Sequence, residues 1–291
     1  MKIQTNNTQQ PLFINHTVHT KSLLYESITV FHRIILGWIA CYSFSILFLI
    51  LAYCSFHYFH LILLFLIFTL SAILIPIFWF LLPYQSIHKI YKKNTFLFTD
   101  IQDLDITDLE AVMKYVAGHG IEVIVNCAAY TAVDKAEDNE DTCRKINALA
   151  VANLAKAAAM NRAKVIHIST DYVYSGVHYK PYSESDETAP CSVYGVTKLE
   201  GERLLFDNCS DAVVLRTSWL YSAYGNNFVK TMIRLGKERE KLSVVFDQIG
   251  TPTYAGDLAK AIMIIIDNKT FIPGIYNFSN EGVCSWYDFT K

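Results

Sequence analysis

The sequence lacks two features, and each absence excludes a class of protein. Lys and Arg number 25 against 27 Asp and Glu, so the basic excess of a nucleic-acid-binding protein is missing. None of the seven cysteines has Cys-x-x-Cys spacing, and their number is odd, which argues against a zinc site and a disulfide scaffold. At 52% apolar residues the chain is not disordered. We therefore expect no nucleic-acid partner and no metal site assigned by the sequence.

Charge is entirely absent from Ile34 to His88. This stretch contains two apolar blocks, 31–54 and 59–82, and each reaches the ~20 residues that cross a bilayer. Basic residues flank the stretch on both sides, a pattern that favours the cytoplasm at both ends: Lys21, Arg33, Lys89, Lys92 and Lys93. We expect a polar tail at 1–27, a transmembrane hairpin within 28–88, and a cytoplasmic domain at 94–291 anchored in the plasma (inner) membrane.

Three other interpretations of the apolar stretch stay open. A secretory signal peptide would be shorter, nearer residue 1 and followed by a small-residue cleavage site. Two buried helices of a soluble protein would be unusual over so long a charge-free run. The stretch could also be foreign to the protein, through a reading-frame or assembly accident.

From Lys89 onward the sequence alternates short β-branched runs with helical patterns. A T-x-x-E capping box at Thr107 and Glu110 opens one of the helices. The expected strands are 96–100, 121–126, 165–169, 212–215 and 243–246, and the expected helices are 107–119, 138–162, 192–208, 228–239 and 255–266. This order predicts an α/β fold with a doubly wound parallel sheet, Rossmann-like but incomplete. Ligands of such sheets bind outside the carboxyl ends of the strands.

The motif Tyr194-Gly-Val-Thr-Lys198 carries the most specific chemistry. Residues four apart share one face of a helix, and an ammonium beside a phenol lowers the phenol pKa from ~10. Such a phenol can exchange a proton with a carbonyl oxygen. The alternative is an ordinary exposed pair on a helix.

Two further motifs directly follow predicted strands. Ser169-Thr-Asp-Tyr172 could present a hydroxyl to a ligand, although these residue types also favour plain turns. Asn126-Cys-Ala-Ala-Tyr130 has small residues that would let a cofactor approach the backbone, or that would simply pack a strand–helix junction.

Together these motifs resemble the extended short-chain dehydrogenase/reductases, and most closely the dTDP-4-dehydrorhamnose reductase family. Longer runs extend the resemblance over about 94–291: 125–137, 169–174, 192–202, 215–221, 225–228 and 247–253. The family reduces the C4 ketone of dTDP-4-dehydro-L-rhamnose with NADPH or NADH, which gives dTDP-L-rhamnose for cell-surface polysaccharide. The sibling dehydratases place an Asp-Glu pair after the threonine. Here Tyr172 follows Asp171, which favours simple keto reduction.

The resemblance implies a role for each matching residue. The catalytic set is Tyr194 as proton donor, Lys198 as partner of Tyr194 and of the nicotinamide ribose, and Thr170 at the keto oxygen. The cofactor residues are Asp100, Asp105, Ile106, Asn126, Ala128, Ala129, Tyr130 and Lys198. The substrate residues are Thr170, Asp171, Tyr172, Tyr194 and Trp219, with Trp219 packing on the sugar. Asp100 could bind a ribose 2′-OH, which leans towards NADH or dual use. The resemblance also allows a homodimer and Mg²⁺, for which the sequence assigns no ligands.

One part of the family pattern is missing. The family begins with a strand, a Gly-rich turn that binds the cofactor pyrophosphate, and a helix. Gly37 is the only glycine before Gly118, and the expected hairpin stands where this unit belongs. The sequence therefore predicts a sheet without its central first strand, a shortened C-terminus, and weak or absent cofactor binding. An inactive fragment or a non-catalytic scaffold of the same family remains the alternative to a working reductase.

Overall fold

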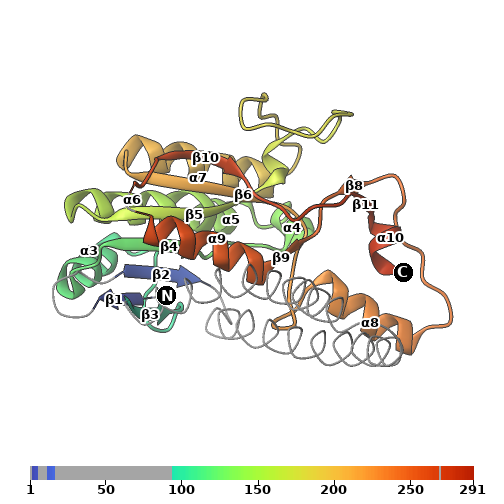
Figure 1. Cartoon of the computed structure of the whole chain (residues 1–291), viewed down its shortest axis with the longest axis horizontal. Helices are drawn as coiled ribbons and strands as arrows, with labels where there is room; N and C mark the ends of the chain where they lie inside the picture. Colours follow the sequence, from blue (N-terminus) through green and yellow to red (C-terminus); the bar gives the residue numbers. More distant parts are fainter. Residues whose placement is uncertain (1, 6–11, 17–93, 269) are drawn as a thin grey trace, which may run out of the picture.

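The computed structural model describes residues 2–5, 12–16, 94–268 and 270–291, and its centre is a seven-stranded sheet (Figure 1). In spatial order the strands are β1 (Lys2–Thr5), β3 (Asn94–Thr99), β2 (Leu12–His16), β4 (Val123–Cys127), β5 (Lys164–Thr170), β6 (Ala212–Thr217) and β10 (Gly274–Asn277). The six strands β3, β2, β4, β5, β6 and β10 are parallel to one another in this spatial order. At the edge, β1 is antiparallel to β3. The predicted doubly wound parallel sheet is confirmed over this part of the chain.

Strand β2 corrects two expectations from the sequence. It lies between β3 and β4 and is parallel to both, with Ile14 in register with Val125. The expected sheet without a central strand is therefore wrong, because 12–16 fill that place and complete the hydrogen-bond ladder. Residues 2–5 and 12–16 of the expected polar tail are strands of the sheet.

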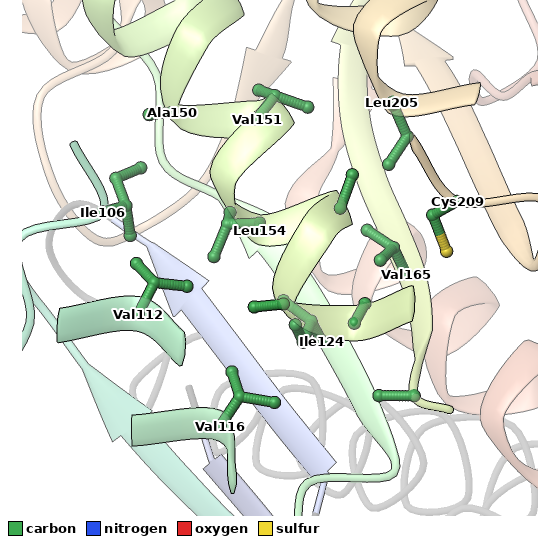
Figure 2. Packing of buried hydrophobic residues seen from close by; sticks show 14 of the residues in the cluster. Ile106, Val112, Val116, Ile124, Ala150, Val151, Leu154, Val165, Leu205 and Cys209 are labelled. Atoms are coloured by element: carbon green, nitrogen blue, oxygen red, sulfur yellow. The ribbon is translucent and has the colours of Figure 1, made fainter. Parts of the chain in front are cut away.

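Helices cover both faces of the sheet. They are α3 (Leu109–His119), α4 (Val133–Ala136), α5 (Glu140–Arg144), α6 (Ala150–Met160), α7 (Val193–Asn208), α8 (Phe228–Glu238), α9 (Ala255–Asp267) and α10 (Trp286–Thr290). The first face carries α3, α6 and α7, whose apolar side chains meet those of β4, β5 and β6 (Figure 2). Figure 2 shows Leu154 of α6 between Val112 of α3 and the sheet residue Ile124. The second face is covered by α9 through Leu258, Ile262 and Met263.

The predicted helix at 138–162 is one continuous run of three segments. Between α5 and α6 the chain forms a π-helical turn, η1 (Lys145–Leu149). Its Asn147 is completely buried. Single π-turns inside α-helices often occur at functional sites.

Two local predictions are wrong. Thr107 does not cap α3, because its hydroxyl is bound to Asp105, and Asp108 caps the helix through Ala111 N instead. Residues 243–246 are not a strand: Val245 and Phe246 are exposed, so their β-branched and aromatic character reflects no buried sheet position. Short pairings lie nearby instead, in β7 (Leu220–Tyr221), β8 (Ile249–Gly250), β9 (Thr253–Tyr254) and β11 (Cys284–Ser285).

The C-terminal elements lie beyond one end of the sheet. Figure 1 places α8, α10, β8 and β11 past the carboxyl ends of the parallel strands, to the right of the sheet. Within the described ranges, no helix has both the length and the apolar character that a membrane span needs. The predicted hairpin at 31–54 and 59–82 lies outside the described residues.

Candidate active site

The site begins where β5 ends. Thr170 is the last residue of β5, and a short 3₁₀ turn, η2 (Asp171–Val173), follows it. The Thr170 hydroxyl accepts a hydrogen bond from Tyr172 N at 3.2 Å and donates one to Asp171 Oδ1 at 3.1 Å. The strand end thus holds a buried hydroxyl and a carboxyl group side by side.

Helix α7 brings Tyr194 to this strand end. Ser192 caps the helix, with its hydroxyl accepting from Gly195 N at 3.1 Å. Gly195 lies so close to Tyr172 that a Cβ there would collide with the Tyr172 carbonyl oxygen. This close approach brings the rings of Tyr172 and Tyr194 together, edge to face, with centroids 5.6 Å apart.

The pKa of Tyr194 corrects the sequence-based expectation. Burial raises it to about 12, the nearby Asp171 adds to the increase, and a hydrogen bond with Thr170 works in the opposite direction. The expected lowering by Lys198 does not occur, because the Lys198 ammonium group is engaged elsewhere. Tyr194 is a phenol at neutral pH, which is the form that can donate a proton.

Asp171 carries an unusual carboxyl group. Burial raises its pKa from 3.8 to about 6, and the hydrogen bond from Thr170 opposes that increase only in part. A carboxyl group with this pKa changes charge close to neutral pH, beside the phenol of Tyr194.

Lys198 is buried below the strand ends. Its side chain is 1% exposed, and Nζ donates to Ile168 O at 2.7 Å and lies 3.2 Å from His167 Nε2. Burial lowers the Lys198 pKa to about 8, because removal from water disfavours the charged form, while Glu202 opposes the decrease.

The loop after β4 is held by buried amides. Asn126 Oδ1 accepts from Ala128 N at 3.0 Å, and Asn147 Oδ1 accepts from Tyr130 N at 2.8 Å. Asn147 Nδ2 also reaches Thr197 of α7 at 3.3 Å. The π-turn therefore ties the predicted cofactor loop, which includes Ala129, to the helix of Tyr194 and Lys198.

Sequence reasoning missed Asn147 and His167. His167 is the only polar residue in the apolar run 165–168, whereas Asn147 has no comparable signal, because the Ala-rich helix also contains Asn153 and Lys156.

The predicted adenine-side residues lie after β3. Asp100 Oδ1 accepts from Gln102 N at 2.8 Å. The Asp105 carboxylate binds the amide and hydroxyl of Thr107, and these bonds lower its pKa. Ile106 is 6% exposed within the hydrophobic core, so its side chain serves packing.

Trp219 packs against the C-terminal helix α10. Its backbone is left-handed, with φ of 47°, which is uncommon for a bulky residue. The indole stacks on Trp286 of α10 with ring centroids 3.6 Å apart and lies against Gly250. In this structure the Trp219 ring packs on α10, and its predicted contact with a sugar stays a prediction.

A buried ion pair supports the strand end from behind. Arg216 of β6 and Glu202 of α7 are 2.6 Å apart, and both are nearly fully buried. Ser169 Oγ also donates to Glu202 at 2.5 Å. Among the described residues no cluster of His, Cys, Asp and Glu side chains could hold a metal ion.

The described residues fit one half of a dinucleotide cofactor. The phenol of Tyr194 and the small residues after β4 lie at the strand ends, where a nicotinamide and its ribose would be bound, and Lys198 lies below them on α7. Strand β2 supplies the position from which a phosphate-binding turn would start. The sequence that follows β2 contains no glycine from 17 to 36.

Comparison with known proteins identifies the family. Residues 84–291 match the family described as "RmlD substrate binding domain". The dTDP-4-dehydrorhamnose reductase of Aggregatibacter actinomycetemcomitans is 45% identical over 212 residues, which cover 70% of this chain and 72% of that protein. The chain belongs to the dTDP-4-dehydrorhamnose reductase family. The Escherichia coli K12 reductase is 47% identical over 189 residues, and the chain spans 63% of its length.

Solved structures of the family have the same fold. The Clostridium acetobutylicum reductase aligns with a TM-score of 0.64 at 48% identity, over 67% of this chain and 68% of that one. The Bacillus anthracis reductase, solved in complex with NADP, aligns with a TM-score of 0.65 at 46% identity over the same shares.

Proposed function

We propose that the chain reduces the C4 ketone of dTDP-4-dehydro-L-rhamnose to dTDP-L-rhamnose with NADPH or NADH. The observation that carries the proposal is the hydrogen bond between Tyr194 and Thr170 at the carboxyl end of β5, with Lys198 of the same helix bonded to Ile168 O of that strand. Family membership supports the substrate, and the Bacillus anthracis complex supports the cofactor. We also propose that the other cofactor and substrate residues predicted from the sequence bind the cofactor and the substrate in this reaction.

The geometry suits proton donation to a ketone oxygen. A bound nicotinamide supplies the hydride. Tyr194 is a protonated phenol at neutral pH, so it can deliver its proton as the oxygen gains negative charge. The Thr170 hydroxyl, 5% exposed at the strand end, would turn its single proton from Asp171 Oδ1 to the same oxygen. Asp171 is the only carboxyl group in the segment 169–174, which suits reduction better than dehydration.

The direct test is oxidation of NADPH and NADH by the purified full chain in detergent with enzymatically made dTDP-4-dehydro-L-rhamnose. Tyr194→Phe removes the proton donor and is expected to lower kcat by about 10²–10⁴-fold. Tyr179→Phe changes a tyrosine that is 88% exposed and is the matched control, with unchanged kcat expected. Folded protein without turnover would instead favour a non-catalytic scaffold.

We also propose that the reductase domain is anchored to the cytoplasmic face of a membrane through a hairpin at 31–54 and 59–82. The charge-free stretch and its basic flanks support this arrangement. Cell membranes washed at alkaline pH should retain the full chain until detergent is added. Release of the chain into the wash would contradict anchoring.

A homodimer is a separate proposal, and light scattering of the detergent-purified chain tests it.

A further inference from the structure

The hydroxyl of Thr170 uses its full hydrogen-bonding capacity at the end of β5. It donates its single proton to Asp171 Oδ1 at 3.1 Å and accepts from Tyr172 N at 3.2 Å. The phenol of Tyr194 also forms a hydrogen bond with Thr170. Because the Thr170 proton points at Asp171, the phenol is the donor in that bond. The proton and both lone pairs of the hydroxyl are therefore engaged.

A ketone oxygen changes this arrangement, because it can only accept hydrogen bonds. In the proposed reaction it takes one hydrogen bond from Tyr194 and one from Thr170. One lone pair of the Thr170 oxygen is then free, and Asp171 has lost its donor. A charged Asp171 would face that lone pair with no proton between the two oxygens, whereas a protonated Asp171 can donate to it.

We propose that Asp171 is a positioning residue that takes up a proton when the ketone binds and, through Thr170, fixes the hydrogen bond to the ketone oxygen. The proton comes from water, and no bond of the substrate changes in this step. Asp171 is only half-buried, so water can reach it. The inference rests on the proposed function, which supplies the ketone and the roles of Thr170 and Tyr194.

The surroundings of Asp171 suit this uptake. Burial raises its pKa to about 6, and the hydrogen bond from Thr170 is the strongest effect that opposes the increase. When Thr170 turns to the ketone, loss of that bond should raise the Asp171 pKa by a further one to two pH units, about the strength of a hydrogen bond to a charged group. The carboxyl group then gains a proton at neutral pH.

The neighbouring titratable groups do not take over this role. Tyr194 of α7 and Tyr172 of η2 stay phenols, since burial raises the pKa of each. Asp134 of α4 faces Tyr172, and Cys143 of α5 faces Tyr194. Among the described residues no Lys or Arg side chain lowers the pKa of Asp171, so burial and hydrogen bonds set the charge of this carboxyl group.

Proton uptake on ketone binding is the first test. The full chain in detergent is titrated calorimetrically with dTDP-4-dehydro-L-rhamnose at pH 7, in buffers of different ionisation enthalpy. NADP⁺ replaces NADPH, so no hydride is transferred. We expect an uptake of about 0.4–0.8 proton per ketone bound. Asp171→Asn should abolish it, and the exposed Asp207→Asn is the matched control and should retain it. Equal uptake by wild type and Asp171→Asn would overturn the proposal.

The pH dependence of ketone affinity is the second test. The complex has the higher Asp171 pKa, so wild-type affinity is greatest below pH 6 and falls as the pH rises through the pKa of the complex, by about 10–100-fold in total. The amide of Asp171→Asn can donate to Thr170 at every pH. This variant should therefore bind independently of pH, and more tightly than wild type at pH 8.5. Weaker binding by Asp171→Asn over the whole range would indicate a structural role and overturn the proposal.

A third measurement needs no ligand. The ¹³Cγ shift of the ¹³C-aspartate-labelled chain against pH reports the Asp171 pKa, and Asp171→Asn assigns the signal by its loss. Thr170→Val removes the donor and should raise this pKa by about one to two pH units. Thr170→Ser keeps the hydroxyl and should leave the pKa near its wild-type value. An unchanged pKa in Thr170→Val would overturn the proposal.

Failure of this inference and failure of the proposed function give different results. Ketone binding without the expected proton uptake overturns the inference, while turnover with NADPH can remain. Proton uptake without turnover supports the inference and contradicts the reductase. A wild-type chain that does not bind the ketone contradicts both.

Discussion

Asp171 shows how burial changes the chemistry of a single residue. It lies between Thr170 and the tyrosine pair, and burial raises its pKa to about 6. The folded chain therefore holds a proton on this carboxyl group in a pH range where the unfolded chain, with an ordinary pKa of 3.8, has lost it. Folding stability from this residue must then fall as the pH rises from about 4 to about 6.

Asp171→Asn should remove that pH dependence. Relative to the variant, the wild-type chain is expected to lose up to about 3 kcal/mol of unfolding free energy between pH 4 and pH 6.5. Denaturant unfolding of both proteins across this range measures the difference, with the exposed Asp207→Asn as the control. A difference that stays constant with pH would mean that the carboxyl group is charged throughout.

At the scale of elements, helix α7 holds the site together through close backbone contact. Gly201 faces the π-turn η1, and a Cβ there would collide with the Asn147 carbonyl oxygen. The same Asn147 binds Tyr130 and Thr197. The distance between α7 and η1 therefore also sets the position of the loop after β4.

Gly201→Ala is expected to destabilise the chain by about 1–3 kcal/mol, because the backbones must separate. Gly118→Ala is the control, since it lies in α3 with no atom within 4 Å of the new Cβ. Alanine there should stabilise the chain by about 0.5–1 kcal/mol. Thermal unfolding of the two variants compares them, and equal stabilities would contradict the contact between α7 and η1.

At the scale of the whole molecule, β2 joins the N-terminal residues to the sheet. Strand β2 lies between two parallel neighbours and its Ile14 is in register with Val125, so proline there interrupts the ladder in the middle of the sheet. Ile14→Pro should cost about 1–3 kcal/mol and reduce hydrogen-exchange protection in 123–127. Ile14→Val keeps the amide and should keep the protection. Unchanged hydrogen-exchange protection in Ile14→Pro would contradict the central position of β2 in the sheet.

The sequence predicts the fold well where local pattern decides it. The strands and helices from 94 to 267 follow β-branched runs and helical periodicity, apart from 243–246, where Val245 and Phe246 are exposed and no strand forms. Strand β2 was missed because a central parallel strand is specified by distant partners, and Leu12–His16 is short and only partly apolar.

The candidate site was likewise predictable where local motifs decide it and not where distant contacts do. Tyr194, Lys198 and Thr170 stand out through their motifs. The direction of the Tyr194 pKa could not be predicted, because it depends on burial and on where the Lys198 amine points. His167 and Asn147 act through contacts with residues more than thirty or forty positions away, which no local pattern records.

The most direct measurement follows the transferred hydrogen. NADPH carrying deuterium on the reactive nicotinamide carbon is incubated with the full chain and dTDP-4-dehydro-L-rhamnose, and the sugar nucleotide is analysed by mass spectrometry and NMR. The account predicts dTDP-L-rhamnose with one deuterium at C4, and its loss in Tyr194→Phe. Unreduced substrate from folded wild-type protein would contradict the account.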